Sequence, residues 1–90
     1  MEKSFDSLEE IKKLPPEEAI TALQQLLERD PGNDTALTLR GRIYWNLGKR
    51  SLAINDYLQA IKINPESNAR LLLQHANSIL DFYNKDLLNP

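Results

Sequence analysis

Apolar residues recur along the chain at the spacing of one helix face, and prolines and glycines divide that pattern into segments. The pattern predicts five helices, near residues 6–14, 16–30, 34–47, 49–63 and from 67 to about 88. No stretch alternates apolar and polar residues as a half-buried strand would. Because only a few residues separate successive segments, we expect neighbouring helices to pack antiparallel in an all-α fold.

The boundaries between segments are set by a small number of residues with known conformational preferences. Pro15 ends the first helix, since the residue before a proline avoids helical angles, and Pro16 suits the first turn of the second helix. Either Asn33 or Asp34 can cap the third helix by accepting from exposed backbone amides. Gly48 can end it by adopting the left-handed conformation.

The chain repeats itself at a fixed interval of 34 residues, which is the separation of Pro31 from Pro65. A fixed period of this length is typical of stacked helix–turn–helix units, which bind partners over an extended surface. We therefore expect repeat packing to supply the core. The matching pairs are Ala19 and Ala53, Ile20 and Ile54, Leu23 and Tyr57, Leu26 and Ala60, and Pro31 and Pro65.

Residues 34–67 resemble a complete tetratricopeptide repeat. Residues 1–33 resemble a partial repeat, and residues 68–90 resemble the lone capping helix that closes such arrays. The resemblance implies one domain over 1–90, built as a right-handed superhelix of about five antiparallel helices. The residues that match the family signature are Gly41, Tyr44, Gly48, Ala53, Tyr57, Ala60 and Pro65.

Three residues depart from the family pattern. Arg40 occupies a site that is usually leucine, and we expect it to reach an acidic group of the preceding repeat, Glu28. Arg50 occupies a site that is usually apolar. His75 stands where the family has a small residue.

The resemblance also implies a function, which is protein–protein interaction through a concave groove lined by the first helix of each repeat. We expect Trp45 to be an apolar anchor and Arg42 an orienting charge for a bound peptide or helix, because these residue types are enriched at binding hot spots. Alternatively, Trp45 is a rim residue that covers the adjacent helix, and Arg42 is a solvated surface arginine. The expected groove residues are Thr35, Thr38, Arg42, Trp45 and Asn46.

Some family members grip the C-terminal carboxylate of a partner with lysines, asparagines and arginines at set positions. None of the corresponding residues matches, so this mode of binding is disfavoured. They are Ser4, Leu8, Leu39, Ala69 and Leu73.

The last predicted helix carries more apolar surface than a closing cap needs. Contiguous exposed apolar surface usually signals a partner, so a structural or regulatory homo-oligomer, simplest as a homodimer, is the alternative function. In the competing interpretation, one apolar stripe of the last helix packs on the fourth helix. A bend or the tail then covers the remaining apolar surface. The residues assigned to self-association are Leu72, Ile79, Tyr83 and Leu87.

Charge is unevenly distributed along the 90 residues, although the net charge is only −2. Residues 1–34 hold four Lys/Arg and nine Asp/Glu, while residues 35–90 hold seven and four. One interpretation of this uneven charge is that the charged residues lie on solvated helix faces. The more specific interpretation is head-to-tail association or an acidic partner. A chain so weakly basic does not suggest nucleic acid.

The sequence offers little for catalysis. It has no cysteine, no metal-binding or phosphate-binding motif, and one histidine, His75, in an apolar stretch where a structural role is the commoner one. We therefore expect a non-enzymatic protein with no cofactor and no metal. The polar N-terminus and the lack of an apolar run of about 18 residues predict no membrane association and a cytoplasmic location.

Overall fold

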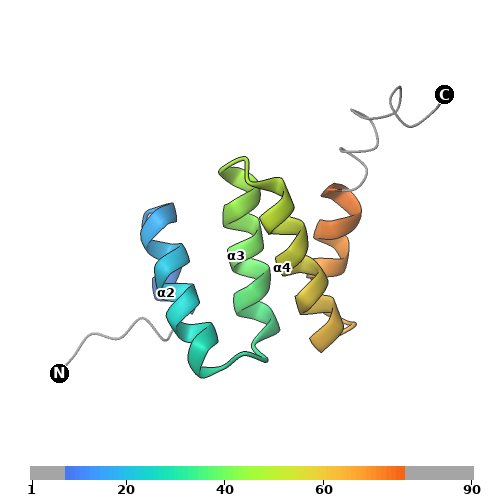
Figure 1. The fold of residues 1–90 in the computed structure, drawn as a ribbon, viewed down its shortest axis with the longest axis horizontal. Helices are drawn as coiled ribbons and strands as arrows, with labels where there is room; N and C mark the ends of the chain where they lie inside the picture. The colour runs from blue at the N-terminus through green and yellow to red at the C-terminus, as the bar shows by residue number, and fades with distance from the viewer. Residues whose placement is uncertain (1–7, 77–90) are drawn as a thin grey trace.

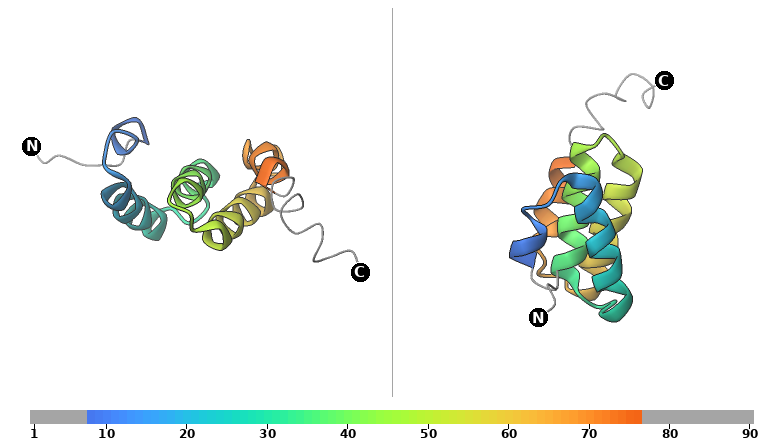
Figure 2. Two further views of the ribbon diagram at one scale, coloured as in Figure 1. Left: turned by 90° about the horizontal axis from the view of Figure 1, so that it is seen from above. Right: turned by 90° about the vertical axis from the view of Figure 1, so that its left-hand side faces the viewer.

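The computed structural model describes residues 8–76, and this part of the chain is all-α with five helices packed in sequence. In Figure 1 the successive helices stand side by side in chain order. The view from above in Figure 2 shows that α1, α3 and the last helix form one row and that α2 and α4 form the other. The helices are α1 (Leu8–Ile11), α2 (Pro16–Arg29), α3 (Asp34–Asn46), α4 (Arg50–Ile63) and residues 69–76.

The helix boundaries follow the predicted signals closely. Pro16 occupies the first turn of α2. Asn33, rather than Asp34, caps α3, and its side-chain oxygen accepts from the Ala36 amide at 2.9 Å. Gly48 has a φ of 83°, the left-handed conformation expected after α3. The first helix ends earlier than predicted, because the chain turns after Ile11, before it reaches Pro15.

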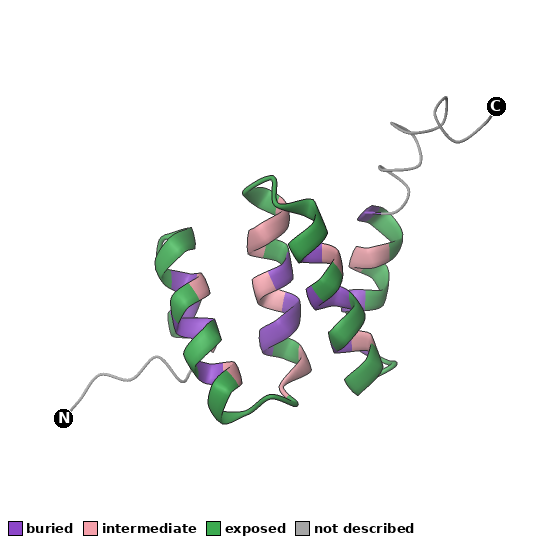
Figure 3. Cartoon of the chain, in the orientation of Figure 1, coloured by how far each residue is buried: buried purple, intermediate pink, exposed green. Residues whose placement is uncertain are grey.

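Two apolar clusters hold the rows together, and they appear as the inward-facing buried segments in Figure 3. The first joins α1, α2 and the start of α3, and the second joins α3, α4 and the last helix. Leu27 packs against both clusters and so connects them. The buried residues are Ile11, Ala19, Ala22, Leu23, Leu26 and Ala36 in the first cluster and Leu37, Ala53, Tyr57, Ala60 and Ala69 in the second.

Helices α3 and α4 approach most closely at Gly41. A Cβ atom at this position would lie 2.6 Å from Cε1 of Tyr57 and 3.2 Å from the Ala53 carbonyl oxygen. Only glycine fits there without moving the neighbouring helix. The position therefore sets the distance between the two helices of this repeat.

Arg40 corrects one prediction, because it pairs with Asp56 on α4 and not with Glu28 of the preceding repeat. Its Nε and Nη2 atoms donate to the two carboxylate oxygens of Asp56 at 2.8 and 2.7 Å. This bidentate hydrogen bonding raises the pKa of Arg40. Asp56 is 4% exposed, so a nearby cation is required to compensate for its burial. The nearest facing helix is the one in the same repeat, and it supplies the partner.

Candidate functional site

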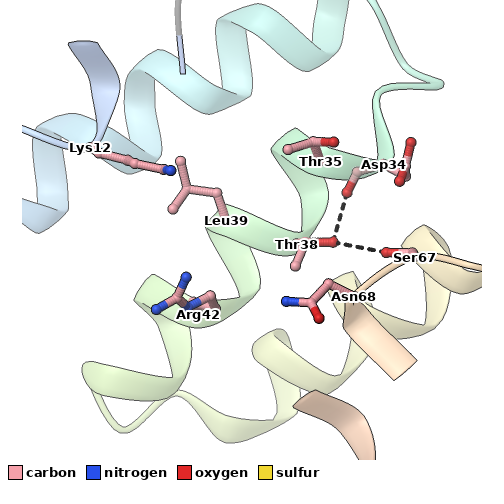
Figure 4. A pocket seen from close by; sticks show the side chains of 8 residues that line it. All are labelled: Lys12, Asp34, Thr35, Thr38, Leu39, Arg42, Ser67 and Asn68. Atoms are coloured by element: carbon pink, nitrogen blue, oxygen red, sulfur yellow. Dashed lines mark hydrogen bonds between the residues drawn. The ribbon is translucent and has the colours of Figure 1, made fainter. Parts of the chain in front are cut away.

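The row formed by α1, α3 and the last helix carries a hollow of about 210 Å³, shown in Figure 4. We call this surface the hollow face. Lys12 follows directly after α1, five lining residues belong to α3, and Ser67 and Asn68 lead into the last helix. The lining residues are Lys12, Asp34, Thr35, Thr38, Leu39, Arg42, Ser67 and Asn68.

The base of the hollow is a hydrogen-bonded link between α3 and the start of the last helix. The Thr38 hydroxyl donates to the Asp34 carbonyl oxygen at 2.8 Å and lies 3.3 Å from the Ser67 hydroxyl. Because the single Thr38 proton is used on Asp34, the Ser67 hydroxyl must donate to Thr38. The Ser67 oxygen also accepts from the Ala69 amide at 3.1 Å. Thr38 thus has its hydroxyl satisfied within the protein and is only 8% exposed.

The opposite ends of the hollow carry opposite charges. At one end the Asp34 carboxylate accepts from Asn64 Nδ2 at 3.2 Å and sits in the first turn of α3, where the helix dipole favours an anion. At the other end lie Lys12 and Arg42, together with the apolar Leu39 (Figure 4). The hollow face is therefore polarised along its length.

Three of the five expected groove residues line the hollow, and they differ in what they offer a ligand. Thr35 and Arg42 are exposed, so their polar groups are accessible. Thr38 lines the same hollow, but its hydroxyl is already engaged with Asp34 and Ser67. The structure thus brings Thr35, Thr38 and Arg42 together on one face.

Trp45 and Asn46 lie outside this hollow. Trp45 is half-buried against the second apolar cluster, and the Arg50 guanidinium carbon lies 4.4 Å from the centroid of its ring. Ile11 occupies the equivalent position in the first repeat and is fully buried in the first cluster. Asn46 is exposed at the end of α3. Contact of either residue with a partner stays a prediction.

The expected groove lacked five of the lining residues, and the repeat period marks two of these, Lys12 and Asn68. The five are Lys12, Asp34, Leu39, Ser67 and Asn68. Lys12 is the counterpart, one period earlier, of Asn46, an expected groove residue, and Asn68 is the counterpart of Asp34 one period later. Projecting the expected groove residue Asn46 onto the first repeat would have found Lys12, and projecting Asp34 of the α3 lining onto the last helix would have found Asn68.

The last helix presents one side that no helix within residues 8–76 covers. Leu71 is 65% exposed, whereas Leu37, at the same repeat position in α3, is 7% exposed under α4. His75 is exposed too, so it has no place in the core. Leu72 is half-buried against the second cluster. The other self-association residues, Ile79, Tyr83 and Leu87, lie outside the described residues.

A second, larger depression of about 390 Å³ lies along α2, lined chiefly by residues of that one helix. It contains Glu17 and Glu18 and none of the expected groove residues. In the part of the chain from 8 to 76, no group of three His, Cys, Asp or Glu side chains could hold a metal ion. Over the same residues, every helix is too short or too polar to cross a bilayer.

The comparisons with known proteins agree with the repeat period. Residues 34–67 match a family model described as a tetratricopeptide repeat, and residues 6–33 match a second model with the same description. The two matches meet at the boundary between α2 and α3. No curated protein and no solved structure matches the chain significantly.

Proposed function

Since the chain belongs to the tetratricopeptide repeat family, we propose that it binds an extended or helical segment of a partner protein on its hollow face. Such repeats are typically protein–protein interaction modules and are generally non-catalytic. The observation that carries the proposal is the polar hollow lined from three successive segments of one row. A partner seated there contacts both repeats and the last helix at once.

The charges and exposure of the lining residues support a binding role for this surface. Thr35 and Arg42 are exposed on α3, and Asn68 is exposed at the start of the last helix. These groups supply a hydroxyl, a cation and an amide around the apolar Leu39, the mixture by which pockets orient a ligand. The Thr38 and Ser67 hydroxyls, 3.3 Å apart, link α3 to the start of the last helix.

A peptide-display selection tests the proposal. The randomised segment is placed between fixed flanks so that it carries no free terminus, and binders are selected on the full 90-residue chain. We expect Thr35→Tyr, which fills the hollow, to lower the affinity for the recovered peptides by about tenfold, equivalent to about 1.4 kcal/mol. Circular dichroism on heating should show unchanged stability, because Thr35 is exposed.

Thr21→Tyr is the matched control, since Thr21 is an exposed threonine on α2 in the other row. It should leave the affinity of the recovered peptides unchanged. Peptides that bind Thr35→Tyr as well as the unaltered chain, or a selection that recovers no binder, would contradict binding on the hollow face.

Self-association through the last helix is a second candidate function, favoured by the 65% exposure of Leu71. A second copy that covers this side would bury an apolar residue whose counterpart in α3 is already covered. Sedimentation velocity across a micromolar range tests it. We expect a dimer that Leu71→Glu dissociates, and a monomer at all concentrations would dispose of this candidate.

A further inference from the structure

Two cations reach the hollow face from different repeats. Lys12 extends from the residue after α1, and Arg42 projects from α3 into the same hollow (Figure 4). Lys12 has one ion pair, with Glu9 at 3.5 Å, and both side chains are largely exposed at 50% and 80%. Exposed pairs of this kind contribute about 0–1 kcal/mol, so a ligand carboxylate can replace Glu9 at little cost.

The rest of the hollow limits what an anionic ligand can be. Leu39 lines the same hollow as the two cations and offers an apolar contact, while Asp34 places a carboxylate at the far end. A polyphosphate backbone would bring charge along the whole hollow and would meet Asp34. A single carboxylate beside an aliphatic group fits the cationic end and avoids that repulsion.

Resting on the proposed function, we propose that the hollow face selects a partner segment with an internal Asp or Glu side chain next to an aliphatic one. The acidic side chain sits between Lys12 and Arg42, and the aliphatic side chain packs on Leu39. The remainder of the segment runs toward Asp34, where a backbone amide or a basic side chain of the partner is favoured. Recognition is thus directional along the hollow.

The display selection gives the first test, because its fixed flanks remove any terminal carboxylate. Recovered peptides should be enriched in Asp or Glu adjacent to Leu, Ile or Val. One recovered peptide and its Glu→Gln analogue are then compared by fluorescence anisotropy. We expect the Glu peptide to bind about two- to fivefold more tightly, as for one exposed ion pair. The preference should vanish near 1 M salt, where the Debye length is about 3 Å.

Variants of the chain show which residues cause the preference for the Glu peptide over the Gln peptide. Lys12→Gln and Arg42→Gln should each remove most of the Glu over Gln preference. Lys13→Gln makes the same change in net charge one residue away, at an exposed lysine outside the hollow, and should leave the preference unchanged. Both peptides should still bind Lys12→Gln, because the apolar contact remains.

The two proposals fail in different ways. Peptides that depend on Thr35 but show no acidic enrichment, or a preference that Lys13→Gln lowers as much as Lys12→Gln does, would overturn the acidic ligand and leave the hollow face as the binding site. Peptides insensitive to Thr35→Tyr would overturn the site itself, and the acidic ligand with it.

Discussion

The two repeats share one period but are stabilised by different means. In the second repeat, α3 and α4 have 13 and 14 residues, an Asn33 cap, a bidentate Arg40–Asp56 pair and contact at Gly41. In the first repeat, Ala22 of α2 stands at the position of Asp56, so no carboxylate is available there for such a pair; α2, like α4, has no side-chain cap. The first repeat therefore depends on apolar packing, and the second adds directed polar contacts.

This difference shows how the hollow face is kept in place. Five of its eight lining residues belong to α3, which has the Asn33 cap and is joined to α4 by the Arg40–Asp56 pair. The first repeat contributes only Lys12. We infer that the second repeat is the platform for binding and that the first repeat supplies a cation at its edge.

Replacing Asp56 is expected to have the largest effect on this comparison. Asp56→Ala copies the first repeat but leaves the Arg40 guanidinium, whose side chain is 20% exposed, without its partner. We expect the free energy of unfolding to fall by about 2–4 kcal/mol, measured by urea denaturation. Arg40→Leu/Asp56→Ala should recover most of that loss. A loss in the double variant equal to the sum of the losses in Asp56→Ala and Arg40→Leu would show that the pair has no coupling.

Trp45→Ile gives the second repeat the residue that the first repeat has at this position, Ile11. The substitution removes part of the half-buried indole and its contact with Arg50. We expect a loss of about 1–2 kcal/mol of stability, with unchanged affinity for selected peptides once the folded fraction is accounted for. Weaker binding at unchanged stability would instead make Trp45 the anchor predicted from the sequence.

Gly41→Ala tests the close approach of α3 and α4. The added methyl group meets the buried Tyr57 ring and the Ala53 carbonyl, at a cost of about 1–3 kcal/mol, partly offset by about 1 kcal/mol of helix propensity. Thermal unfolding should show a net loss of about 0–2 kcal/mol. Gly32→Ala is the matched control, since no atom lies within 4 Å of its added Cβ, and its stability should be unchanged or slightly higher.

Alkaline pH should produce the smallest effect. Burial raises the pKa of Tyr57 above its ordinary value of 10.0, so the folded state holds the phenolic proton more tightly than the unfolded state. The resulting stability is complete below about pH 10 and is lost as the pH rises through the folded pKa. Tyr57→Phe should show a shallower alkaline loss in denaturation curves than the unaltered chain. Identical slopes would contradict a shifted Tyr57.

The fold was accessible from the sequence because its signals are local. Pro16 and Gly48 set helix ends through their backbone preferences, and Asn33 does so through its side-chain oxygen. The repeat period shows which segments are equivalent. The partner of Arg40 was not accessible in this way, because it depends on which side of α4 faces α3. The available signal was the position of Asp56 directly before the inward-facing Tyr57. A carboxylate buried there requires a nearby cation, which indicates a partner such as Arg40.

The candidate site was predictable in part. Thr35 and Arg42 follow from the position of α3 in a repeat, and both line the hollow. The use of the Thr38 hydroxyl could not be foreseen, because Ser67 lies 29 residues away and is brought close by the turn after α4. His75 is exposed because the described residues place no helix over that side, which periodicity alone does not reveal.

Mapping of backbone amide chemical shifts with a selected peptide tests the central claim most directly. Binding on the hollow face predicts that the largest shifts fall on Lys12, Thr35, Leu39, Arg42 and Asn68. Amides on the other row, such as Thr21 on α2 and Leu58 on α4, should stay unchanged. The largest shifts on α2 or α4, with the hollow face unaffected, would contradict the account.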